Sequence, residues 1–148
     1  MKTLVIGYGN TLRGDDGVGP RVAEQLEALV GEQMRLLSVH QLTPELAAEM
    51  VQAEVVWFVD AWVGGVKPTV QTLTMASAVP AMDHDWRPET LLHMAKTLYD
   101  AEPTAYHLLI PAQQFDYGET LSAMALSGVE WAVQTIKAVV EEKGVCHA

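Results

Sequence analysis

The hydrophobic pattern of the chain changes between two periods. Short, mostly apolar segments at 4–6, 35–39, 55–59 and 106–110, together with an alternating segment at 70–75, predict β-strands. Apolar residues recur at helical spacing after Val18, Pro44, Pro88 and Leu121, which predicts helices there. Thr43 and Pro44 resemble an N-cap followed by a proline in the first turn, and Gly31 and Gly144 are expected helix ends.

The predicted order, β-α-β-α-β-β-α-β-α, is typical of an α/β fold. Residues 55–59 are apolar at every position, so this strand is expected to be buried on both faces of a mostly parallel sheet. The turn at 64–68 is too short for a helical crossover, so we expect the third and fourth strands to pair antiparallel, with the fourth at an edge. The expected architecture is one domain, residues 1–148, a three-layer sandwich with five strands and helices on both faces.

Composition narrows the class of protein. The chain has 148 residues, of which 49% are apolar, so it can fill a core and is not a disordered chain. Nine basic against 19 acidic residues give a net charge of −10, which argues against nucleic acid and anionic membrane as partners. The single cysteine, Cys146, provides no disulfide framework and favours a reducing compartment. The apolar run at 4–6 is too short for a signal peptide, and we expect a cytoplasmic monomer.

Polar residues follow the ends of the predicted strands, where open α/β sheets bind ligands. The first strand is followed by Gly7, Gly9, Asn10, Arg13, Asp15 and Asp16; the second by His40; the third by Asp60; the fourth by a loop with His84. A dinucleotide site is not favoured, because Leu12 replaces the third glycine of the fingerprint and two carboxylates would repel a phosphate.

Asp16, Asp60 and His84 could instead form an incomplete site for a divalent metal, with two oxygen ligands and one imidazole. Simpler roles stay open: Asp15 and Asp16 could cap the first helix, Asp60 could bind turn amides, and His84 could be a solvated loop residue. The other imidazoles are His40, His93, His107 and His147; we expect His93 to be packed, His107 to lie in a strand and His147 to lie in a frayed tail. The serine elbow and the H-E-x-x-H motif are absent.

Residues 7–19 read GYGNTLRGDDGVG and fit the string G-x-G-N-x-L-x-x-D-[DE]-x-x-G directly after the first strand. In this string the chain resembles the [NiFe]-hydrogenase maturation endopeptidases, and the likeness extends to Asp60-Ala61, His84 and Ile110-Pro111. The resemblance implies an α/β protein that removes a C-terminal extension from the hydrogenase large-subunit precursor after nickel insertion. It implies catalytic and metal-contacting roles for Asp16, Asp60 and His84, and a structural role for the loop residues Gly7, Gly9 and Asn10.

The implied metal is nickel carried by the substrate, for which Zn²⁺ or Cd²⁺ would substitute in vitro. Many members carry D-G-G-T after the second strand, where this chain has His40, Gln41, Leu42 and Thr43. This stretch resembles the subgroup that serves cytoplasmic, NAD-coupled bidirectional hydrogenases. We expect it to help select the substrate, and His40 could join the metal ligands. Two alternatives remain: a receiver-like signalling domain, and a nickel-dependent binding module without catalysis.

Overall fold

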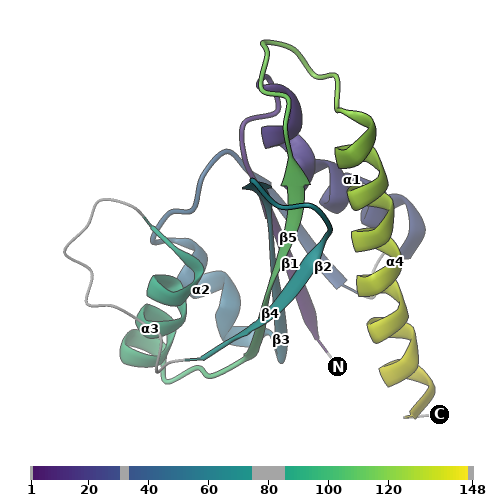
Figure 1. Cartoon of the computed structure of the whole chain (residues 1–148). Coiled ribbons are helices and arrows are strands. Elements are labelled where there is room, and N and C mark those ends of the chain that lie inside the picture. Colours follow the sequence, from purple (N-terminus) through teal and green to yellow (C-terminus); the bar gives the residue numbers. More distant parts are fainter. Residues whose placement is uncertain (1, 31–33, 75–85, 147–148) are drawn as a thin grey trace.

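The computed structural model describes residues 2–30, 34–74 and 86–146 (Figure 1). A five-stranded sheet has the order β2-β1-β3-β5-β4. Strands β2, β1, β3 and β5 are parallel, and β4 runs antiparallel to β5. The strands are β1 (Thr3–Tyr8), β2 (Met34–Val39), β3 (Val55–Val63), β4 (Thr69–Leu73) and β5 (Thr104–Ala112).

Helices cover both faces of this sheet, as the sequence predicted (Figure 1). Helices α1 (Val18–Val30) and α4 (Ala123–Cys146) pack on one face. The short α2 (Leu46–Glu49) and α3 (Pro88–Tyr99) pack on the other. Two 3₁₀ turns, η1 (Gly14–Gly17) and η3 (Met50–Gln52), precede α1 and follow α2. The α/β class and the single antiparallel strand are therefore confirmed.

The partner of β4 was predicted wrongly. β4 lies at the edge and is antiparallel, but it pairs with β5 and not with β3. The reason is that β5 pairs in parallel with the whole of β3, from Val55↔Thr104 to Val63↔Ala112, and so occupies the place beside it. The chain reverses direction after β3, as expected of a short turn. β4 then pairs with β5, which comes later in the sequence.

Several predicted ends of strands and helices also differ from those in the structure. β3 continues past Asp60 to Val63, because β5 pairs with it that far. β5 continues through Pro111 instead of stopping there. Proline has no amide hydrogen, but the pairing of β4 with β5 ends at Leu109, so Pro111 is tolerated in the strand. Helix α4 continues through Gly144. Thr43 is not an N-cap, since α2 begins at Leu46 with no side-chain cap.

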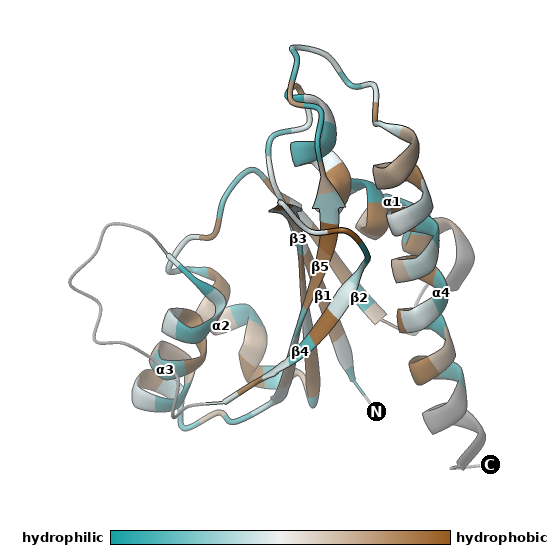
Figure 2. Cartoon of the chain, in the orientation of Figure 1, coloured by the Kyte–Doolittle hydropathy of each residue, from teal (hydrophilic) through white to brown (hydrophobic). Residues whose placement is uncertain are grey.

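Each face of the sheet has its own apolar core (Figure 2). Alternate residues of β1, β3 and β5 point to opposite faces, because side chains alternate along a strand. Val5, Trp57 and Val59 face α1 and α4, whereas Ile6 and Phe58 face α2 and α3.

Among the described residues, no helix is both long and apolar enough to cross a bilayer.

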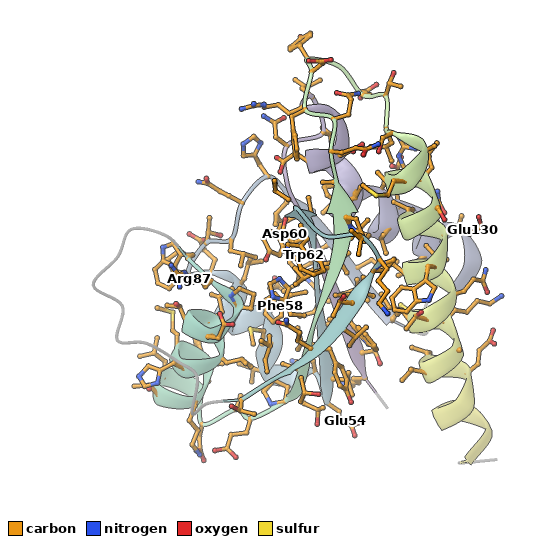
Figure 3. The ribbon with its side chains drawn as sticks, viewed as in Figure 1. Glu54, Phe58, Asp60, Trp62, Arg87 and Glu130 are labelled. Carbon is orange, nitrogen blue, oxygen red and sulfur yellow. The ribbon has the colours of Figure 1, made fainter. Side chains whose placement is uncertain are left out.

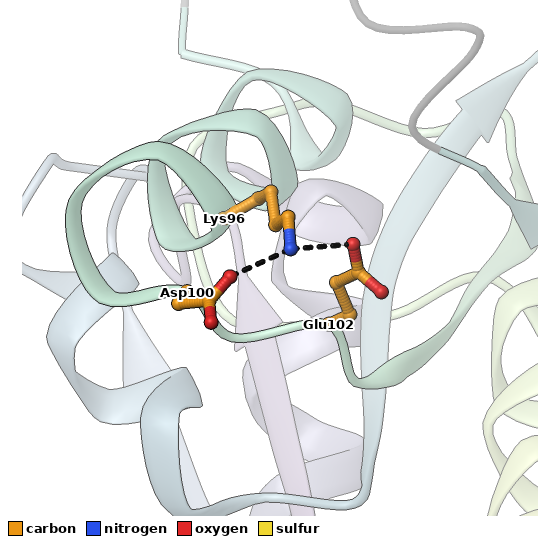
Figure 4. Close-up of polar contacts among 3 residues, drawn as sticks. All are labelled: Lys96, Asp100 and Glu102. Atoms are coloured by element: carbon orange, nitrogen blue, oxygen red, sulfur yellow. Dashed lines mark hydrogen bonds and ion pairs between the residues drawn. The ribbon is translucent and has the colours of Figure 1, made fainter.

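Helix α3 ends in a compact turn that leads to β5 (Figure 4). Asp100 adopts a left-handed φ of 54°, and the amides of Asp100 and Ala101 donate to carbonyls of the last turn. Lys96 pairs with Asp100 at 2.6 Å and with Glu102 at 2.9 Å. Both carboxylates are exposed to solvent, so these ion pairs stabilise the fold little.

Candidate active site

The loop after β1 folds back onto itself around Asn10. The Asn10 side-chain oxygen accepts a hydrogen bond from the Leu12 amide at 2.9 Å, as in an Asx turn. The Asn10 amide donates to Oδ2 of Asp16 at 2.7 Å. Gly9 has a φ of 145°, and a Cβ at this position would lie 1.9 Å from the Asp16 carbonyl oxygen. The loop therefore holds Asp16 in place and needs a glycine beside it.

Two more glycines bring η1 and α1 against the sheet. A Cβ on Gly7 of β1 would lie 2.0 Å from the Gly19 carbonyl oxygen, and one on Gly19 would lie 2.4 Å from the Val59 carbonyl oxygen. The backbone at the start of α1 thus rests directly on β1 and β3. This contact places the preceding turn, with Asp16, at the carboxyl edge of the sheet.

Asp15 has a structural task and does not cap the first helix, contrary to the simpler expectation. It is 0% exposed and accepts hydrogen bonds from the amides of Gln113, Gln114 and Ser122 and from the Ser122 hydroxyl. Burial alone would raise the pKa of Asp15, but these hydrogen bonds outweigh it and lower the pKa. Asp15 therefore ties η1 to the loop between β5 and α4.

Asp60 lies within β3, not at its end, yet it is still at the rim of the sheet. The pairing of β1 with β3 stops at Gly7↔Val59, so Asp60 is the first β3 residue beyond this pairing. Its Oδ1 accepts the amide of Ala61 at 2.7 Å. Figure 3 shows Asp60 further along β3 than Phe58, toward the end of the sheet where the loop after β1 lies.

Asp60 has a raised pKa, to which the charge of Asp16 contributes. Burial raises the pKa of Asp60 to about 6, against the effect of hydrogen bonds from the Ala61 amide and the Tyr8 hydroxyl, and the Asp16 charge raises it further. Two carboxylates that repel each other at a partly buried edge are stabilised when a divalent cation binds. Among the described residues, no three His, Cys, Asp or Glu side chains gather closely enough to hold a metal. His84, the third residue of the predicted site, lies outside the described residues.

Sequence reasoning missed two residues of this site, Tyr8 and His107. The Tyr8 hydroxyl and Nε2 of His107 are 3.0 Å apart, and the two rings stack at a centroid distance of 6.4 Å. Burial lowers the pKa of His107, and burial together with Asp60 raises the pKa of Tyr8. The alternation of side chains along each strand could have identified both residues. Tyr8 lies two positions after Ile6, and His107 two positions after Ala105, so both face α2 and α3.

A cavity of about 380 Å³ opens beside these residues. The sheet lines it with Tyr8, Asp60 and His107, and the start of α3 with the two residues before it lines it with Trp86, Arg87, Pro88, Glu89 and Thr90. A larger groove of about 490 Å³ runs between η1, α1 and the loop before α4, but neither Asp16 nor Asp60 lines it. The smaller cavity therefore lies beside Asp60, although Asp16 is not among the residues that line it.

The other residues that the sequence offered as candidates lie in different parts of the structure. In the stretch after β2, His40 and Gln41 are exposed, Thr43 is half-buried and Leu42 is 4% exposed in the core. His93 is exposed on α3, so the expectation that it packs was wrong. His147 lies outside the described residues, and Cys146 is the last residue of α4.

Solved structures share this architecture. The hydrogenase maturating endopeptidase HybD from E. coli is 19% identical over 97% of this chain and 94% of its own, with a TM-score of 0.78. The [NiFe] hydrogenase maturation protease HycI from Thermococcus kodakarensis KOD1 is 20% identical over 95% and 92%, with a TM-score of 0.76. The hydrogenase 2 maturation peptidase from Thaumarchaeota archaeon SCGC_AB-539-E09 is 22% identical over 95% and 99%, with a TM-score of 0.72.

The chain thus has the fold of the hydrogenase maturation endopeptidases, and the fold implied by the motif is confirmed. The sequence itself matches no protein-family model and no curated protein. A shared fold at this level of identity does not carry over the reaction, which has to be argued from the site.

Proposed function

We propose that this protein is an endopeptidase that removes the C-terminal extension of a [NiFe]-hydrogenase large-subunit precursor after nickel has been inserted. The observation that carries the proposal is that Asp16, held by the loop after β1, and Asp60, just beyond the β1–β3 pairing, both lie at the carboxyl edge of this fold. The loop that holds Asp16 is the same GYGNTLRGDDGVG segment on which the resemblance was based. Motif, fold and carboxylate pair therefore support one activity.

Nickel in the precursor serves as the recognition key in this proposal. Asp16 and Asp60 supply oxygen ligands, and His84 is proposed as the imidazole ligand that completes a borderline donor set. A precursor without nickel lacks the cation that relieves the repulsion between the two carboxylates, so it is held poorly. Docking of the loaded precursor fixes the scissile peptide beside Asp16, which can then accept a proton from the attacking water.

The substrate is proposed to belong to the cytoplasmic, NAD-coupled bidirectional hydrogenases, on the basis of the residues after β2. His40 and Gln41 are the exposed members of that stretch and are available to contact a protein substrate. Leu42 is buried, so its contribution would be to shape the loop and not to touch the substrate.

The decisive experiment mixes the protein with nickel-loaded and nickel-free precursor and follows the mass of the precursor. We expect the loaded precursor alone to lose the mass of its extension. Cleavage of both forms at one rate would remove nickel from the recognition step. Binding of loaded precursor without any loss of mass would favour the non-catalytic binding module.

The receiver-like alternative fits the sheet less well. Receiver domains have five parallel strands in the order 2-1-3-4-5. Here the outer strand β4 is antiparallel and precedes β5 in the chain. Uptake of a labelled phosphoryl group from acetyl phosphate with Mg²⁺ would nevertheless establish that alternative directly.

A further inference from the structure

Three polar side chains occupy inward positions of the neighbouring strands β1, β3 and β5 on the face toward α2 and α3. Below them this face is apolar, with Leu4 and Ile6 in β1, Val56 and Phe58 in β3 and Ala105 in β5. The next inward positions are Tyr8, Asp60 and His107. Because all three line the same cavity, they form one polar group beside these apolar residues.

The hydrogen bonds in this group have one consistent direction. The Tyr8 hydroxyl carries a single proton, and a carboxylate can only accept. Tyr8 and Asp60 follow the paired residues Gly7 and Val59 on neighbouring strands and line the same cavity, so the Asp60 carboxylate is the acceptor toward which the Tyr8 hydroxyl can direct its proton. The contact of 3.0 Å between the Tyr8 oxygen and Nε2 of His107 must then use a proton on the imidazole. In this arrangement Tyr8 would accept from His107 and donate to Asp60.

This direction fixes the form of the His107 ring. Burial favours the neutral ring by lowering the pKa of His107, although Glu89 at the start of α3 acts the other way. A neutral ring carries one proton, which the contact with Tyr8 places on Nε2. Nδ1 is then bare. A phenylalanine pair would fill the same space, but it would leave Asp60 with the Ala61 amide and no side-chain donor.

We infer that Tyr8 and His107 are positioning residues for Asp60: His107 Nε2–H donates to the Tyr8 oxygen, and Tyr8 donates to the Asp60 carboxylate and holds it in one orientation. The part of this inference that concerns the reaction rests on the proposed function, in which Asp60 contacts the metal of the precursor. Carboxylates that bind metals are themselves commonly held by such outer hydrogen bonds, and their loss weakens metal affinity about 10- to 100-fold.

The first test reads the tautomer of His107 in the free protein. Long-range ¹⁵N–¹H NMR spectra distinguish an imidazole protonated at Nε2 from one protonated at Nδ1. We expect the Nε2–H form in the wild type, and loss of this preference in Tyr8→Phe. A ring protonated at Nδ1 in the wild type would overturn the inference, whatever the protein does to a precursor.

The second test is a double-mutant cycle on the affinity for Ni²⁺ alone, measured by calorimetry, and on the rate of precursor processing. Tyr8→Phe should weaken Ni²⁺ binding about 10- to 100-fold and slow processing. The double variant Tyr8→Phe/His107→Phe should lose no more than Tyr8→Phe, because both residues act through one hydroxyl. His107→Gln, which keeps a side-chain N–H, should retain more affinity than His107→Phe. Additive losses would overturn the inference.

Matched controls separate positioning from packing. Tyr106→Phe removes a hydroxyl from the same strand, where the Tyr106 ring packs on Trp57 away from the site. His93→Phe removes an exposed imidazole from α3. Both should leave Ni²⁺ affinity and processing unchanged. If the wild type processes no precursor, the proposed function is wrong, but the tautomer of His107 still tests the proposed hydrogen bonds. If the wild type processes the precursor and Tyr8→Phe processes it at the same rate, only the inference about Tyr8 and His107 is wrong.

Discussion

Asp15 and Asp16 are neighbours in the chain, but the fold gives their carboxylates different surroundings. Asp15 is enclosed by four donors from the loop between β5 and α4. Asp16 is half-buried, its Oδ2 accepts the backbone amide of Asn10 at 2.7 Å, and its charge acts on Asp60. The first carboxylate is satisfied by the protein, whereas the second keeps capacity for a ligand.

The same substitution at these two positions should therefore have opposite effects. Asp15→Asn turns an N–H of the new amide toward a donor, which should reduce the free energy of unfolding by roughly 1–3 kcal/mol. Asp16→Asn keeps an oxygen for the Asn10 amide and removes repulsion with Asp60, so stability should be unchanged or slightly higher while processing is lost. Denaturant unfolding and the precursor-mass assay check both variants. Normal processing by Asp16→Asn would contradict its assignment.

The raised pKa of Asp60 predicts a stability gain on neutralisation. Its folded pKa of about 6 exceeds an unfolded value of about 3.9, so the folded state binds more protons between these values. The free energy of unfolding therefore falls as pH rises through this window. Asp60→Asn removes the buried charge and should add roughly 1–3 kcal/mol at pH 8, and little at pH 4.

Urea unfolding of the Asp60→Asn variant and the wild type at the two pH values measures this difference. Asp116→Asn, an exposed acid in the loop after β5, is the control and should change little at either pH. An Asp60 variant that is less stable than the wild type at pH 8 would mean that the carboxylate stabilises the fold, and the account of its burial would be wrong.

At the scale of elements, backbone contacts determine where Asp16 lies. Gly7, Gly9 and Gly19 let the loop, η1 and the start of α1 approach β1 and β3 more closely than any side chain would allow. The strand signal and the helix signal were both readable in the sequence. The distance between these elements depends on which atoms meet across them, which no single segment contains.

Gly9→Ala should therefore disturb the site through the backbone. The new Cβ would meet the Asp16 carbonyl oxygen at 1.9 Å, and the φ of 145° is unfavourable for alanine. We expect a stability loss of about 1–3 kcal/mol and a marked loss of Ni²⁺ affinity. Gly118→Ala is the matched control, because its φ of 131° is similar but nothing lies within 4 Å of its Cβ. It should lose stability and keep Ni²⁺ affinity; equal losses of affinity would show that backbone strain alone is responsible.

At the scale of the whole molecule, acidic residues far outnumber basic ones. The net charge is −10. The ion pairs found among the described residues all have partners that are at least partly exposed to solvent: Arg35–Glu49, Lys96–Asp100, Lys96–Glu102 and Lys137–Glu141. Exposed pairs contribute little, so repulsion among the acids should dominate the long-range electrostatics.

Added salt should therefore stabilise the protein at pH 8. Screening of the repulsion between about 0.02 and 0.3 M NaCl should raise the free energy of unfolding by about 1 kcal/mol, or a few degrees in Tm. Thermal unfolding at several salt concentrations measures this, with a tetramethylammonium salt as a control for specific sodium binding. A falling Tm would mean that ion pairs outweigh repulsion.

The sequence by itself determined the elements and their order, because hydrophobic period and turn residues act within a few positions of each other. It also determined the α/β class, the edge position of β4, and the candidates Asp16 and Asp60. His40, Gln41 and His84 stay predictions as functional residues.

Only the tertiary structure decided the contacts between segments far apart in the chain. It placed β5 between β3 and β4, gave Asp15 its donors from residues about a hundred positions away, and brought Tyr8 to His107. The physical reason is that hydrogen-bond partners and burial depend on register and packing, which are set by the whole sheet and its helices. A sequence pattern shows which face a side chain takes, but not what it meets there.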